Sequence, residues 1–157
     1  MDESNLRQKL RQLFTSQKLA VLATYGDHQP YCSLMAFAAT DDLKYLILTT
    51  KRETHKFANI QHHPQVAALI DNRRNQVEDF QQALAVTALG EVTLPPPSDS
   101  KAFLDIYLFK HPYLRRFCQA PSCVLLAIKV ERYLAVTNFR NFMSLEEDYL
   151  QIQELRP

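Results

Sequence analysis

The stretch Leu46–Asn59, with the sequence LILTTKRETHKFAN, changes from apolar to polar within a few residues. Its first half predicts a buried β-strand, and its second half predicts a helix that starts directly after the strand. Hydroxyl groups and cations alternate at the junction, in the order Thr50, Arg52, Thr54 and Lys56. Backbone N–H groups at the start of a helix attract anions. We therefore interpret this junction as a phosphate pocket that contains no glycine.

A simpler interpretation of the same segment also stands. Thr50 and Glu53 have the spacing of a capping box, which would explain the polar residues as an ordinary helix start. Lys51, Arg52 and Lys56 would then be solvated surface charges. The segment alone leaves both interpretations open.

Glycine is scarce in the chain, which contains only Gly26 and Gly90. The dinucleotide-binding turn and the Walker loop both need several glycines for close approach of the backbone to phosphate, so both are excluded. A phosphorylated ligand would have to be held by side chains and a helix start.

Composition limits the class of protein further. The chain has 157 residues, of which 46% are hydrophobic, and we expect one domain over residues 1–157 with a proper core. A formal charge of +1 gives no electrostatic basis for binding nucleic acid. Apolar runs such as Val124–Ile128 are too short to span a bilayer, and the charged start Met1–Leu10 does not have the pattern of a signal peptide.

The cysteines and histidines form no recognisable metal or nucleophile motif. Cys32, Cys118 and Cys123 contain no CxxC pair, and a reduced, cytoplasmic protein is the simplest account, although Cys118 and Cys123 could pair. Adjacent residues on a helix face different ways, so His62 and His63 are better explained as a cationic helix end than as metal ligands. We assign no metal site and no catalytic residue.

The order of the predicted elements points to a mainly β fold with helices, a six-stranded antiparallel barrel. A barrel this narrow is filled by its own side chains, so a flat ligand would lie outside it and a second subunit would cover it. We expect strands at Lys18–Tyr25, Pro30–Thr40, Leu43–Thr50, Gln65–Asn72, Ala83–Leu94 and Ser122–Phe139, the last bent near Glu131. We expect helices at Ser4–Gln17, Thr54–His62, after an N-cap at Ser98, and at Pro112–Cys118, with residues 73–82 as a loop or short helical turn.

The ordered pieces LAVLAT, PYCSLMAFA, LILTTKRETHK, NIQHHPQVAALIDN and AVTALGEVTL resemble the pyridoxamine 5′-phosphate oxidase-related family of FMN-binding split barrels. The closing segments YLFKHPYLRRF and SCVLLAIKVERYLAVTNF resemble one branch of it, and the resemblance extends from Leu6 to Met143. It implies a split β-barrel of the FMN-binding type, and a homodimer with two flavins at the subunit interface.

The resemblance also implies a set of cofactor residues. The second strand would contribute backbone groups along the flavin, and the end of the third strand with the following helix start would hold the FMN phosphate. Two residues after the fourth strand would approach the ring or the flavin of the second subunit. In this order they are Ser33, Leu34, Met35, Ala36 and Phe37; Thr49, Thr50, Lys51, Arg52, Thr54, His55 and Lys56; and Asn72 and Arg73.

The substrate half of the oxidase site is not retained. Ala38 occupies the place of a lysine that binds the substrate phosphate in the oxidase, and Ala85 replaces a glutamine that enters its flavin site. The tyrosine and arginine of the oxidase's substrate helix correspond to Tyr107 and His111, and Tyr107 fits either a core position or a substrate-facing one. We therefore expect that pyridoxamine phosphate is not a substrate.

Three functions follow as hypotheses. The first is an FMN-dependent oxidoreductase acting on an unidentified small molecule, with the flavin supplying the redox chemistry. The second is a flavin carrier or sensor without turnover. The third is haem binding, as in some split-barrel relatives, with His55, His63 or His111 as an axial ligand.

Overall fold

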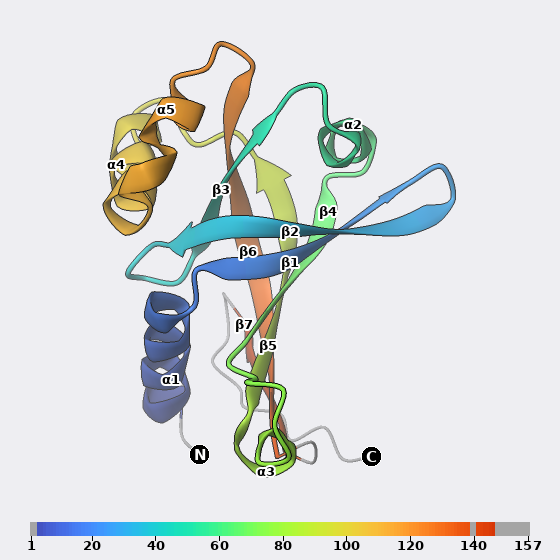
Figure 1. Ribbon diagram of the computed structural model, residues 1–157, viewed down its shortest axis with the longest axis vertical. Coiled ribbons are helices and arrows are strands. Elements are labelled where there is room, and N and C mark those ends of the chain that lie inside the picture. The colour runs from blue at the N-terminus through green and yellow to red at the C-terminus, as the bar shows by residue number, and fades with distance from the viewer. Residues whose placement is uncertain (1–2, 139–140, 147–157) are drawn as a thin grey trace.

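The computed structural model describes residues 3–138 and 141–146 and is shown in Figure 1. The strands are β1 (Leu19–Gly26), β2 (Gln29–Ala39), β3 (Tyr45–Lys51), β4 (Gln65–Asp71), β5 (Leu84–Thr93), β6 (Cys123–Thr137) and β7 (Asn141–Glu146). The helices are α1 (Glu3–Ser16), α2 (His55–His62), α3 (Asp79–Gln82), α4 (Ser100–Lys110) and α5 (Arg115–Cys118), with a 3₁₀ turn η1 at Pro112–Leu114.

The first six strands form a closed antiparallel barrel. Their order is β3-β2-β1-β4-β5-β6, and β3 pairs with β6 from Tyr45↔Lys129 to Lys51↔Cys123, which closes the ring. The predicted six-stranded split barrel is therefore confirmed.

The second half of β6 differs in detail from expectation. The strand β7 was not predicted, and it pairs with β6 from Arg132 to Thr137, on the edge that β3 leaves free. The expected bend near Glu131 is present, because the pairing with β5 shifts register there: Leu89 faces Arg132 and Gly90 faces Val130. The predicted end of this strand at Phe139 lies outside the described residues.

The interior of the barrel is filled by apolar side chains, as its small size requires. Helix α1 adds Leu6, Leu10 and Phe14 to this core, and α2 adds Phe57 and Ile60. The barrel therefore has no room for a flat ligand inside.

Helix α4 covers the outer face of β2 and β3, as Figure 1 shows on the side opposite α2. A second buried cluster joins Phe103, Tyr107 and Leu108 of the helix to Ala38 and Ile47 of the strands. None of the described helices is both long enough and apolar enough to cross a bilayer.

The barrel is split between β2 and β3. These strands pair over only three residues of β2, from Phe37↔Leu48 to Ala39↔Leu46. The rest of β2 turns toward the β1–β2 hairpin, while β3 continues toward α2 along β6 (Figure 1). Both strands thus have a free edge beside the same opening.

Candidate cofactor site

Three contacts enclose the opening between β2 and β3. The pair Phe37↔Leu48 is its closed corner. The rings of Tyr31 on β2 and His55 on α2 lie with centroids 4.7 Å apart, which joins the far end of β2 to the helix start.

The third contact joins β3 to α2, since the Oγ1 atoms of Thr50 and Thr54 lie 3.1 Å apart. One strand edge, one strand end and one helix start therefore surround a single opening.

The start of α2 is capped by Thr54 and not by Thr50. Thr54 has extended backbone angles, and its Oγ1 accepts a hydrogen bond from the N–H of Phe57 at 3.4 Å. The same hydroxyl donates to the carbonyl of Lys51 at 2.9 Å. The capping-box interpretation of Thr50 with Glu53 is therefore wrong. The buried Thr50 instead contacts the hydroxyl of the capping residue Thr54.

The predicted cationic residues all lie at this helix start, but their side chains have different surroundings. The ammonium of Lys51 lies 5.8 Å from the ring of Phe117, on the outer side of β3 under α5. Arg52 is exposed and Lys56 is half-buried, and no carboxylate in the described ranges lies within ion-pair distance of either. The exposed His55 lies 4.0 Å from Asp27. The first amides of α2 add positive potential at the same place.

Thr49 faces the opposite side of β3 from Thr50. Its buried Oγ1 donates to the hydroxyl of Tyr107 at 2.9 Å, beneath α4. Successive side chains of a strand point to opposite faces, so only Thr50 of the two faces α2. The structure therefore does not bring Thr49 to the opening by its side chain.

Ser33 supplies a polar atom that has no partner. It lies on the inward face of β2 with Met35 and Phe37, and its Oγ is buried without a hydrogen-bond partner in the described structure. Buried hydroxyls are nearly always hydrogen-bonded, so an orphaned one beside an opening indicates a missing ligand or water. The sequence indicated only the backbone of this residue.

The free edge of β2 also carries unpaired main-chain groups. The β1–β2 turn contains Asp27 and His28, with φ of 51° and 58°, which is the pattern of a type I′ hairpin. In that hairpin the flanking pair Gly26↔Gln29 is hydrogen-bonded, and bonded and non-bonded pairs then alternate. Every second residue of β2 therefore points its N–H and C=O away from β1 and into the opening. These residues are Cys32, Leu34 and Ala36.

Helix α2 is fixed to the barrel by a buried amide. The side-chain amide of Asn59 donates to Thr24 Oγ1 at 3.1 Å, and both residues are buried. The helix comes so close at Gly26 that a Cβ there would collide with the Asn59 side chain. This contact fixes the position of the helix start.

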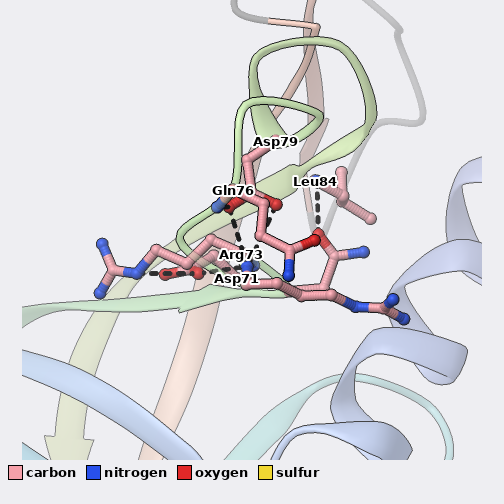
Figure 2. Close-up of polar contacts among 7 residues, drawn as sticks. Asp71, Arg73, Gln76, Asp79 and Leu84 are labelled. Atoms are coloured by element: carbon pink, nitrogen blue, oxygen red, sulfur yellow. Dashed lines mark hydrogen bonds and ion pairs between the residues drawn. The ribbon is translucent and has the colours of Figure 1, made fainter.

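Asn72 and Arg73 are not brought to this opening within one subunit. They follow β4, at the end of the barrel opposite α2, beside the α3 loop (Figure 1). Figure 2 shows how this loop is held: Arg73 Nε lies 3.3 Å from Asp71, and the carboxylate of Asp79 accepts hydrogen bonds from the backbone of residues 74 and 76. Asn72 Oδ1 accepts from the N–H of Leu84 at 2.8 Å. Within the chain these polar groups serve the loop.

Tyr107 and His111 are both enclosed beneath the surface. Tyr107 is 1% exposed, and burial raises its pKa to about 12. His111 is 0% exposed: its Nε2 lies 2.7 Å from the carbonyl of Phe37, and its Nδ1 lies 2.9 Å from the hydroxyl of Tyr113. The core assignment of Tyr107 is confirmed, and neither side chain is open to a substrate.

Burial lowers the pKa of His111, so the ring is neutral near pH 7. A neutral ring donates from one nitrogen and accepts at the other, so Nε2–H donates to Phe37 and Nδ1 accepts from Tyr113. With both nitrogens engaged, His111 is unsuited as a haem ligand.

The other predicted histidines lie on α2. His55 is exposed at the opening. His62 and the exposed His63 form the end of α2, where His63 is the C-cap.

The thiols of Cys118 and Cys123 are both free. Burial raises the pKa of both thiols, that of Cys123 to about 11, which makes them poorly reactive.

Comparison with solved structures shows the same fold in other proteins. A haem-binding protein from Mycobacterium smegmatis is similar with a TM-score of 0.79 and 15% identity, over 89% of this chain and 57% of its own. ChuZ from Campylobacter jejuni is similar with a TM-score of 0.79 and 13% identity, over 99% of this chain and 64% of its own. A FAD-binding protein from Mesorhizobium loti has a TM-score of 0.65 and 17% identity, over 82% of this chain and 90% of its own.

The chain spans less than two thirds of the first two of these proteins, so their activities as whole proteins do not transfer to it directly. No curated protein sequence matches the chain significantly. The family model for pyridoxamine 5′-phosphate oxidase matches residues 6–136, which is most of the chain. The chain therefore belongs to the pyridoxamine 5′-phosphate oxidase-related family.

Proposed function

We propose that the protein is an FMN-binding flavoprotein that works as an oxidoreductase at a homodimer interface. The observation that carries this proposal is the free edge of β2, with the orphaned Oγ of Ser33, facing the cationic start of α2 across one opening. A flavin mononucleotide has the matching form, since a flat ring with polar edges is joined by a chain to a phosphate.

The fit can be assigned residue by residue. The main-chain groups of Cys32, Leu34 and Ala36 would meet the polar edge of the ring, and the Ser33 hydroxyl would gain a partner. At the other end, Thr54 with the first amides of α2 would meet the phosphate. The cations there are Arg52 and Lys56, and the imidazole of His55 lies beside them.

When bound, the flavin supplies the redox chemistry, and the protein supplies binding, orientation and electrostatics. The described side chains around the opening include the imidazole of His55. A scheme in which the flavin itself accepts and passes on electrons requires no further acid or base.

The homodimer is supported by the outer face of the sheet. The outward side chains of β1 and β2 should be polar if the face met water, yet Leu19 and Leu34 are 50% and 67% exposed. Neighbouring outward positions on β1, β4 and β5 are also apolar. They include Val21, Ala23, Ala67, Leu69 and Leu89. A second copy of the chain would cover this face and close the opening beside it.

Pyridoxamine 5′-phosphate is not the substrate in this proposal. Ala38 is buried against α4, and His111 uses both ring nitrogens within the protein. Neither residue therefore supplies the cation that the oxidase uses at the corresponding position to bind the substrate phosphate. Purified protein with FMN should not oxidise pyridoxamine 5′-phosphate above background.

Haem binding is the second candidate, supported by the exposed imidazole of His55 at the opening, 4.7 Å from the ring of Tyr31. It is also supported by the similar fold of the haem-binding mycobacterial protein. A carrier or sensor function differs from the enzyme only in lacking turnover.

The absorption spectrum of freshly purified protein tests these candidates. A flavin spectrum, with fluorescence released on heating, supports FMN, and chromatography of the released flavin distinguishes FMN from FAD. A Soret band that disappears in His55→Ala would support haem instead. Bleaching of bound flavin by NAD(P)H, followed by reoxidation in air, would support an oxidoreductase over a carrier.

A further inference from the structure

A second cavity lies between α1 and α4, beside the short turn that joins β2 to β3. Its volume is about 330 Å³, which falls within the range of small-ligand pockets. Its walls are mostly apolar and include Phe14, Ala38 and Ile106. Two cationic side chains, Arg11 and Lys110, also line it.

The side chain of Lys110 is half-buried, and its ammonium is held by two contacts with the protein. Its Nζ donates to the carbonyl of Phe14 at 2.6 Å and lies 3.8 Å from the centre of the Phe37 ring. The carbonyl belongs to the last turn of α1, which carries a partial negative charge. An ammonium has three N–H groups, so these two contacts leave a third for another acceptor.

Among the described residues no carboxylate lies within ion-pair distance of the Lys110 ammonium. Asp41 also lines the cavity, but it is exposed, and its backbone carbonyl accepts from Arg11 Nε at 3.1 Å. Even partial burial of an ammonium without a counter-ion is costly, because it removes part of the charge from water. Burial accordingly lowers the pKa of Lys110 to about 8.

We propose that this cavity binds a small amphipathic carboxylate, with its anionic head on Lys110 and its apolar body against Ile106 and Phe109. The ring of Phe109 is 92% exposed and lines the cavity, so an apolar body would cover an aromatic surface that now meets water. A phosphate fits less well, because a doubly charged group needs more donors than these mostly apolar walls provide.

The binding of 2-naphthoate, measured by calorimetry with 2-naphthylmethanol as the uncharged analogue, tests this proposal. Lys110→Met keeps an unbranched side chain that is shorter by the charged atom alone, and it should weaken the binding of naphthoate at least tenfold. Lys101→Met is the matched control, since Lys101 lies on the same helix, is exposed and pairs with Asp105. Lys101→Met should leave the affinity for naphthoate unchanged. Naphthylmethanol should bind weakly to all three proteins.

The pH dependence of the unmodified protein gives an independent measurement. Naphthoate affinity should fall as the pH rises above about 8, because Lys110 then loses its proton. Carboxylates and guanidinium groups keep their charge over this range. His111 is adjacent, but burial lowers its pKa, so it stays neutral there.

A third variant covers the case in which Lys110→Met does not fold. Ala39→Leu fills part of the cavity wall without removing a charge, and it should also weaken naphthoate. Equal binding of naphthoate and naphthylmethanol, tighter binding of inorganic phosphate, affinity that does not change with pH, or no detectable binding would each overturn the proposal. None of these outcomes bears on FMN, whose binding is monitored separately.

Discussion

The hydroxyl oxygens of Thr50, at the end of β3, and Thr54, at the start of α2, lie 3.1 Å apart. This contact joins a strand of the barrel to the helix start that carries the cations. Thr54 also uses its hydroxyl as the N-cap, so Thr50 holds the cap that positions the first amides of α2. The proposed phosphate site therefore combines hydroxyls that also have a structural role with Arg52 and Lys56, for which no described carboxylate lies within ion-pair distance.

The double variant Arg52→Ala with Lys56→Ala should lose affinity for FMN and keep affinity for riboflavin. A charge-assisted hydrogen bond contributes about 1.5–3 kcal/mol, so loss of even one such contact should weaken FMN about tenfold or more. Fluorescence titration measures both ligands. Lys101→Ala, a distant exposed lysine, is the control. Equal losses for FMN and riboflavin would show that these cations do not contact the phosphate.

Ser33→Ala should stabilise the unliganded protein slightly while weakening flavin binding. Its buried hydroxyl has no partner in the described structure, and an unsatisfied buried polar group costs about 1–3 kcal/mol. Denaturant unfolding with and without FMN measures both effects. A lower free energy of unfolding for the unliganded variant would mean that the hydroxyl already has a partner, such as a bound water.

Leu34→Glu should convert the proposed dimer to a monomer and reduce FMN binding. Leu34 is 67% exposed on the outer face of β2, so the fold of one subunit does not depend on it. Val77→Glu is the control, because Val77 is 79% exposed on the loop before α3. Light scattering after size-exclusion chromatography measures the mass. A Leu34→Glu protein that stays dimeric would place the interface elsewhere.

His111 should make folding stability fall as the solution is acidified. Burial lowers the pKa of His111 in the folded state, so the unfolded chain binds the proton first as the pH falls below about 6.5. The contribution of His111 to the free energy of unfolding is therefore fully present above that pH and is lost as the pH falls through the folded-state pKa. Urea unfolding at pH 7 and pH 5 measures the difference.

Two variants isolate this effect. His111→Gln should be less stable at pH 7 but should show a smaller decrease between pH 7 and pH 5. His62→Gln changes an exposed histidine at the end of α2 and should behave as the unmodified protein does. An unchanged pH dependence in His111→Gln would mean that His111 is not the titrating group.

The sequence predicted the barrel well where the signal was local. Alternating apolar residues placed six strands within about two residues of their observed ends, within the usual uncertainty of boundaries. Strand β7 was missed because its stability comes from pairing with β6, which no local pattern reveals. The junction Thr50–Lys56 was found because its hydroxyls and cations are consecutive in the chain.

Contacts between distant segments could not be predicted in the same way. The orphaned hydroxyl of Ser33 and the contact of Tyr31 with His55 depend on how β2 diverges from β3. The resemblance to the family assigned His111 to a known position, but its enclosure depends on packing between α4 and β2. Resemblance can give the position of a residue in the fold, whereas packing decides whether solvent reaches it.

The last residues of β3 have one neighbouring strand only, because β2 has already diverged from them. Thr49, Thr50 and Lys51 are matched by residues 125, 124 and 123 of β6, more than seventy positions later in the chain. During folding, the end of β3 that leads into the proposed phosphate site cannot form its strand pairing until β6 is in place. Cofactor capture and completion of the barrel should therefore coincide, so a half-assembled chain would discriminate poorly between flavins with and without a phosphate.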